Sequence, residues 1–282
     1  MPRSPKTMDD VLEYIRNHRC FTHPIFQDWA DVNPPSEVVG ALFHQIQSFC
    51  ASTRPGWALP QALQQHGLAK QSQLLEEIVE SESDHGPELA KMAGYLVNRR
   101  ANRVVCSNLD DAPAVERQLR VDSDRILGNL PGYDPVTGLM RQTRKAIQVF
   151  DRRKRADRES TLRNLGSALA LEMISNGQLI PGEKHALIDS GLYGATMKDP
   201  EMHYLLEHYG EIGAEQQHEK NAVAAVSAVL NDETRPLILE GVNDFLDSLV
   251  SLWDLLDAAL LASGYREDIA RGAGSAAAAS AA

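Results

Sequence analysis

Apolar residues recur at helical spacing along most of this chain. In residues 36–52 one helical face carries Val38, Val39, Leu42, Phe43, Ile46 and Phe49. Similar spacing predicts helices over 8–18, 58–66, 70–101, 113–128, 139–156, 159–177 and 237–262. Gly86-Pro87 is expected to interrupt or kink the helix over 70–101, and a surface loop is expected within 107–141. No stretch alternates with period two for long enough to predict a strand, so we expect an all-α helical bundle in a single domain.

One further helix, predicted over 203–229, breaks the apolar pattern with a polar stripe. At 3.6 residues per turn, the stripe holds two imidazoles and two carboxylates on one side, contributed by His208, Glu211, Glu215 and His218. Charged groups on a face that packs against the core cost free energy unless they are paired or bind a cation. The stripe therefore indicates a site rather than ordinary core, with a solvated charge stripe as the bland alternative.

Two other predicted helices repeat this chemistry. Glu82 and His85 form a Glu-x-x-His pair, one turn apart on one face. Glu172 stands among apolar neighbours, including Leu169 and Leu171, where a carboxylate is rarely left unpaired. Helical bundles build di-iron and di-manganese sites from carboxylates and imidazoles of this kind. The sequence thus predicts a metal site made by Glu82, His85, Glu172, His208, Glu211, Glu215 and His218.

Composition narrows the class of protein. The formal net charge of −11 argues against non-specific nucleic-acid binding, which needs a basic surface. Three widely spaced cysteines fit no zinc or redox motif and favour a reduced, cytoplasmic compartment. No signal peptide or long apolar run predicts export or a membrane span. The tail 266–282 is of low complexity and is expected to be disordered, which leaves 1–265 as the helical domain.

The order of these motifs resembles a family. His23-Pro24-Ile25-Phe26, Glu82-x-x-His85, Glu172 and the late run to His218 are similar to features of the haem-oxygenase-like helical proteins that bind no haem. That group includes thiaminase II proteins, pyrroloquinoline-quinone synthase, the chlamydial protein associating with death domains, and di-iron oxidases and oxygenases. The resemblance covers roughly residues 20 to 230, and the di-iron branch matches best.

The resemblance to that branch implies a haem-oxygenase-like fold and two iron ions held by the seven residues named above. It implies an oxidoreductase that activates O₂ and takes electrons from an external donor. The implied reaction is N-oxygenation or oxidative C–C cleavage of a small amine, amino acid or fatty-acid-like substrate in biosynthesis. The resemblance also implies a homodimer. Glu211 stands where the branch has histidine, and His208, one turn earlier, is the alternative ligand.

Two other classes of function stay open. The first is a metal-free relative of the cofactor-biosynthesis or thiaminase II type that uses His and Glu as acid and base. Such a protein should show an activated cysteine or an arginine-rich pocket. The second is a non-enzymatic helical interaction protein, in which the polar stripe would face solvent and bind no metal.

Overall fold

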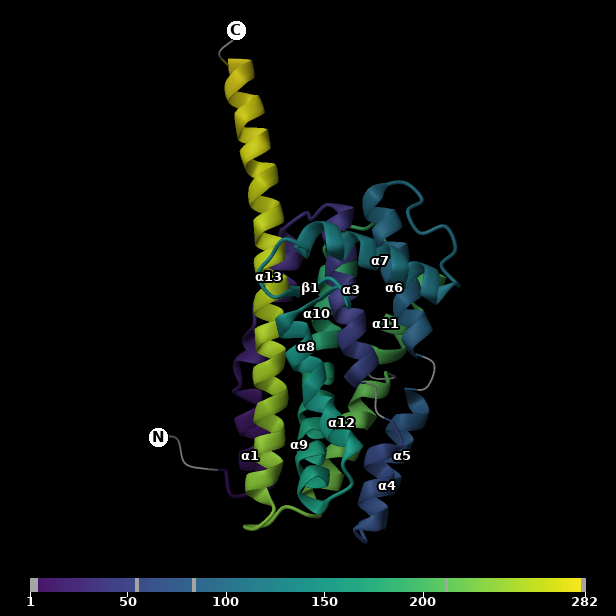
Figure 1. Cartoon of the computed structure of the whole chain (residues 1–282), viewed down its shortest axis with the longest axis vertical. Helices are drawn as coiled ribbons and strands as arrows, with labels where there is room; N and C mark the ends of the chain where they lie inside the picture. The colour runs from purple at the N-terminus through teal and green to yellow at the C-terminus, as the bar shows by residue number, and fades with distance from the viewer. Residues whose placement is uncertain (1–4, 54–55, 83–84, 211–212, 280–282) are drawn as a thin grey trace.

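In a computed structural model of the chain, most helices form where the periodicity predicts them (Figure 1). The structure describes residues 5–53, 56–82, 85–210 and 213–279, and for residue 85 and residues 264–279 it describes the backbone alone. The first half of the chain forms α1 (Met8–Arg16), α2 (Ile25–Asp31), α3 (Ser36–Thr53), α4 (Ala58–Gln65), α5 (Ala69–Ser81), α6 (His85–Ala101) and α7 (Ala112–Leu127). The second half forms α8 (Arg141–Gln148), α9 (Arg158–Ile174), α10 (Ile180–Lys184), α11 (His203–His208), α12 (Ala214–Ser227) and α13 (Arg235–Ala279). The prediction of an all-α protein is confirmed.

Helix α9 is the centre of the bundle. It packs against α13 on one side and against α12 on another, and α12 in turn packs against α5 (Figure 1). Gly166 and Gly241 let α9 and α13 approach closely, because a Cβ at Gly166 would lie 2.1 Å from the Ile238 carbonyl oxygen. Nearly every side chain of α9 is consequently buried, Glu172 among them.

The predicted single helix over 203–229 is wrong. The chain forms two helices there, α11 and α12, and the backbone leaves helical geometry at Tyr209, which has an extended conformation. Gly210 then adopts a φ of +90°, a region that side-chain-bearing residues rarely enter. Gly213 caps the start of α12. The glycines end the first helix and turn the chain, so His208 and Glu215 lie on different helices instead of one stripe.

The predicted end of the helix over 159–177 is also wrong. The helical path continues from α9 through a π-turn at Ser175–Leu179 into α10, and through a second π-turn at His185–Asp189. Proline lacks an amide hydrogen and clashes with the preceding turn of an α-helix. A wider π-turn just before Pro181 accommodates that residue without ending the helix.

Two further features concern the middle of the chain. The predicted interruption of the helix over 70–101 is confirmed, because α5 ends at Ser81 and α6 begins at His85; Gly86-Pro87 lies in the first turn of α6, where proline is favoured, and not at a kink. The expected loop in 107–141 contains a short antiparallel pair, β1 (Tyr133–Asp134) with β2 (Leu139–Met140). Short 3₁₀ turns occupy Arg19–Thr22, Val149–Lys154 and Pro200–Met202. Among the described residues, none of the helices combines the length and the apolar character that a membrane crossing requires.

Candidate metal centre

Five of the seven predicted ligands come together inside the bundle. Glu82 caps the end of α5, Glu172 lies in the last turns of α9, and His208 is the last residue of α11. Glu215 and His218 lie one turn apart in the first half of α12. Four helices thus contribute to one cluster, which we call the inner cluster: Glu82, Glu172, His208, Glu215 and His218.

The two histidines of the inner cluster face the carboxylates at a constant distance. His208 Nε2 lies 3.5 Å from Glu82 Oε1 and 3.7 Å from Glu215 Oε1. His218 Nδ1 lies 3.6 Å from Glu82 Oε1 and 3.6 Å from Glu172 Oε2. Glu82 therefore stands between both imidazoles. One ligand atom each from Glu82, Glu215 and His218 lies within 4.8 Å of the other two.

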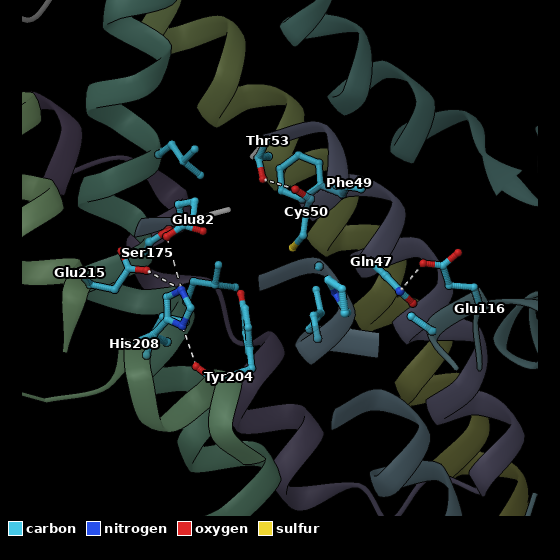
Figure 2. A pocket seen from close by; sticks show the side chains of 18 of the residues that line it. Gln47, Phe49, Cys50, Thr53, Glu82, Glu116, Ser175, Tyr204, His208 and Glu215 are labelled. Carbon is cyan, nitrogen blue, oxygen red and sulfur yellow. Dashed lines mark hydrogen bonds and ion pairs between the residues drawn. The ribbon is translucent and has the colours of Figure 1, made fainter. Parts of the chain in front are cut away.

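A backbone hydrogen bond sets the orientation of His208. Its Nδ1 lies 2.6 Å from the carbonyl oxygen of Tyr204, one turn earlier in α11. Because a carbonyl oxygen only accepts, Nδ1 carries the proton and the lone pair of the neutral ring is on Nε2. Nε2 is the atom that points toward Glu82 and Glu215 (Figure 2). Metal-binding histidines are typically oriented in this way, through a hydrogen bond from the other ring nitrogen.

Four of the five residues of the inner cluster are buried, and Glu82 is partly buried. Glu172 and Glu215 are each 5% exposed, His218 is 4% exposed and His208 is 3% exposed. The alternative of a solvated charge stripe is therefore wrong, because a solvated stripe would face water. Burial also leaves Glu215 Oε2 with no hydrogen-bond partner among the described residues. A buried acceptor without a partner carries a desolvation cost that a bound proton or cation would remove.

Two carboxyl groups of the inner cluster, those of Glu172 and Glu215, resist ionisation. Burial raises the pKa of Glu172 to about 8; the Glu82 carboxylate contributes to this rise, and the Arg153 guanidinium opposes it. Burial likewise raises the pKa of Glu215 well above its usual range, with repulsion from Glu172 and Glu82 added. Crowded anions in a site of low dielectric constant favour whatever neutralises them, either protons or a multivalent cation.

Two predicted ligands cannot be placed. Glu211 and the side chain of His85 lie outside the described residues. The backbone of His85 begins α6, just after the end of α5 that carries Glu82. The roles of both residues as ligands stay predictions.

The sequence analysis missed one buried carboxylate, Glu183 in α10. It is 5% exposed, its Oε2 has no hydrogen-bond partner among the described residues, and burial raises its pKa to about 7 while the nearby His208 lowers it. Glu183 also contributes to the raised pKa of Glu215. One signal in the sequence pointed to it. Glu183 lies on an apolar helical face with Ile180, Ala186 and Leu187, but the predicted helix ends at 177, before this segment.

A cavity of about 340 Å³ adjoins the inner cluster (Figure 2). Glu82, Glu172, His208 and Glu215 line one part of it, and apolar side chains including Phe49, Leu89, Leu171, Leu179 and Ile180 form its walls. Phe49 lies in this wall, whereas Trp57 does not line the cavity and is 48% exposed. Cavities of this size hold small molecules. The inner cluster therefore adjoins a space large enough for a substrate.

The donor set of the inner cluster fits a transition metal. Carboxylate oxygens and neutral imidazoles are suitable ligands for iron, manganese and zinc. Distances of 3.5–3.7 Å are long for hydrogen bonds. They approach the separation of two ligand atoms that share one ion, since bonds of about 2.1 Å at tetrahedral angles put ligand atoms about 3.4 Å apart. Glu82, Glu172, His208, Glu215 and His218 could together hold one or two ions.

Comparisons with protein-family models, with curated proteins and with solved structures found no match.

Proposed function

We propose that the inner cluster binds a pair of iron ions and that the protein is a non-haem di-iron oxidoreductase of the haem-oxygenase-like kind, acting with O₂ on a small molecule in the adjoining cavity. One observation supports this proposal above the others. Three carboxylates and two imidazoles from four helices, all buried except the partly buried Glu82, converge beside a cavity of about 340 Å³. Bundles that hold two metals use this combination of side chains.

In this proposal the residues of the chain have separate tasks. The bound iron would supply the O₂ chemistry, with electrons from an external donor. Glu82 stands between both imidazoles and would be a ligand with them, while the Tyr204 carbonyl keeps the Nε2 lone pair of His208 directed at the cluster. Phe49, Leu171 and Leu179 give the space beside the cluster an apolar wall. Arg153, which lies close enough to lower the pKa of Glu172, favours the ionised, metal-binding form of that carboxylate.

Iron loading tests the proposal directly. The protein is purified under anaerobic, reducing conditions, incubated with ferrous iron, separated from excess metal, and analysed for iron and for its optical spectrum on exposure to O₂. We expect about two iron ions per chain and a transient visible absorption band. Folded protein that retains no iron, manganese or zinc would overturn the proposal.

Cys50 supports a second candidate function, metal-free nucleophilic catalysis of the thiaminase II type. Cys50 lines the same cavity, across from Glu82 and His208 (Figure 2). A thiol with a nearby acid or base can form a covalent intermediate. If this candidate holds, metal-free protein turns over its substrate and Cys50→Ser abolishes turnover without loss of fold. If the di-iron proposal holds, Cys50→Ser retains its iron and its reaction with O₂.

A further inference from the structure

The side chains that line the cavity beside the inner cluster include acids but no strong base. Four carboxyl groups line it, those of Glu82, Glu116, Glu172 and Glu215, and burial raises the pKa of Glu172 and Glu215. Among the described residues that line it, none is a lysine or an arginine. At the Glu116 end, away from the inner cluster, a carboxylate would meet repulsion with no lining lysine or arginine to offset it, whereas an ammonium group would be attracted.

Two arginines of α6, Arg99 and Arg100, have partners outside the cavity. The Arg99 guanidinium donates to the backbone carbonyls of Tyr193, at 2.9 Å, and Gly194, at 2.6 Å. Arg100 donates to the carbonyls of Pro34, at 2.5 Å, and Asn33, at 3.0 Å. Neither arginine lines the cavity, and both stabilise loops instead.

One carboxylate of the cavity lies apart from the inner cluster. Glu116 in α7 is exposed, and because it lines the cavity, the cavity opens to solvent beside it. Gln47 in α3 is 8% exposed, also lines the cavity, and donates from Nε2 to Glu116 Oε1 at 3.0 Å. Figure 2 shows this pair on the opposite side of the cavity from Glu82, His208 and Glu215. A buried amide thus holds an anionic oxygen at the mouth of an otherwise apolar passage.

We propose that the cavity selects amines over carboxylic acids, with the substrate ammonium bound by Glu116 and Gln47 at the mouth. The apolar body of the substrate then lies along Phe49, Leu89 and Leu179, and its uncharged end reaches the inner cluster. This inference rests on the proposed function for the reaction itself. It narrows the substrate from three classes to one, since amino acids and fatty acids both bring a carboxylate.

Binding to metal-free protein tests the inference apart from any iron chemistry. Isothermal titration calorimetry compares hexylamine with hexanoate, which has a similar length and the opposite charge. We expect hexylamine to bind at least about tenfold more tightly than hexanoate. Glu116→Gln, which keeps the size of the side chain, should weaken hexylamine binding by about tenfold and leave hexanoate binding unchanged or improved.

Two variants sharpen this test. Glu116→Lys should reverse the preference and favour hexanoate, because it places a cation at the mouth of the cavity. Glu13→Gln removes an exposed carboxylate of α1 that does not line the cavity, and it should bind hexylamine like the wild type. Equal binding of the two ligands, or a Glu116→Gln variant with wild-type affinity for hexylamine, would overturn the inference.

Measuring iron binding together with hexylamine binding separates the failure of this inference from the failure of the proposed function. A protein that binds iron but does not prefer hexylamine would keep the di-iron proposal and exclude the selection of amines. A protein that binds no metal but prefers hexylamine, through Glu116, would exclude the di-iron proposal and keep the selection of amines.

Discussion

Two groups of the same residue types sit in different surroundings in this protein. The inner cluster contains Glu82, Glu215 and His218, and an outer cluster contains Glu88, His203 and Glu207. In the outer cluster His203 Nδ1 lies 3.0 Å from Glu88 Oε1, and Nε2 lies 3.4 Å from Glu207 Oε1. The His203 side chain is 50% exposed, whereas that of His218 is 5% exposed.

The comparison shows that burial, rather than residue type, distinguishes the two clusters. In the outer cluster water screens the charges, and a direct contact between Glu88 and His203 contributes little. In the inner cluster Glu172 and Glu215 have lost most of their hydration, so these carboxylates favour a proton or a cation. This difference is why we propose the inner cluster, and not the outer one, as the metal site, and the following predictions test that proposal, beginning with the largest effect.

Removing one inner ligand should abolish iron binding. Glu172→Ala and His218→Ala each remove a ligand atom from a buried site, and we expect both variants to retain less than about a tenth of the wild-type iron. Glu88→Ala and His203→Ala make the same chemical changes in the outer cluster and serve as matched controls that should retain all of it. Iron analysis after anaerobic loading decides, with circular dichroism to confirm the fold. Loss of iron in the outer variants alone would reverse the assignment.

The stability of the metal-free protein should fall as the pH rises from 5 to 8. The pKa of Glu172 is about 8 in the folded protein and near 4.5 in the unfolded chain, so the folded state binds more protons across this interval. Folding thus loses stability at up to about 1.4 kcal/mol per pH unit, a total of a few kcal/mol. The midpoint of urea unfolding measured at several pH values reports this slope. Glu172→Gln, which cannot ionise, should make the slope smaller, and Glu183 and Glu215 account for the slope that remains. An unchanged slope would argue against a buried carboxyl at this position.

Glu183 should show a conflict between stability and function. Glu183→Leu removes a buried carboxyl whose Oε2 has no hydrogen-bond partner among the described residues. We expect the metal-free protein to gain about 1–2 kcal/mol in the free energy of unfolding. Glu183→Gln keeps the shape and polarity and should gain less. A loss of iron or of reaction with O₂ in the leucine variant would place Glu183 within the metal centre, whereas destabilisation by leucine would contradict the expectation.

The smallest effect is expected in the outer cluster. His203→Ala should change the free energy of unfolding by less than about 0.5 kcal/mol, because an exposed ion pair gains little and is screened by salt. Urea unfolding at low and at high salt measures the effect. A change above about 1 kcal/mol would show that the outer cluster contributes more to stability than its exposure indicates.

The all-α fold and most of the helices follow from the periodicity of the sequence. The apolar positions of α3 predicted its extent, from Ser36 to the last residues before Thr53. The apolar surroundings of Glu172 follow from the sequence for a similar reason, since Leu169 and Leu171 flank it on a buried helix. Periodicity failed where glycine and proline acted against expectation. Gly210 ended a helix that the pattern continued, and Pro181 was accommodated by a π-turn where the pattern ended a helix.

The sequence by itself determined which carboxylates and imidazoles stand among apolar residues, because helical spacing fixes on which face of its own helix a side chain lies. Only the tertiary structure decided which side chains meet. The chain turns at Gly210 and Gly213, and this turn puts His208 and Glu215 on separate helices that converge at Glu82. The continuation of α9 into α10 buried Glu183 near His208. Such meetings depend on the packing of helices distant in sequence, and spacing along one helix carries no information about that packing.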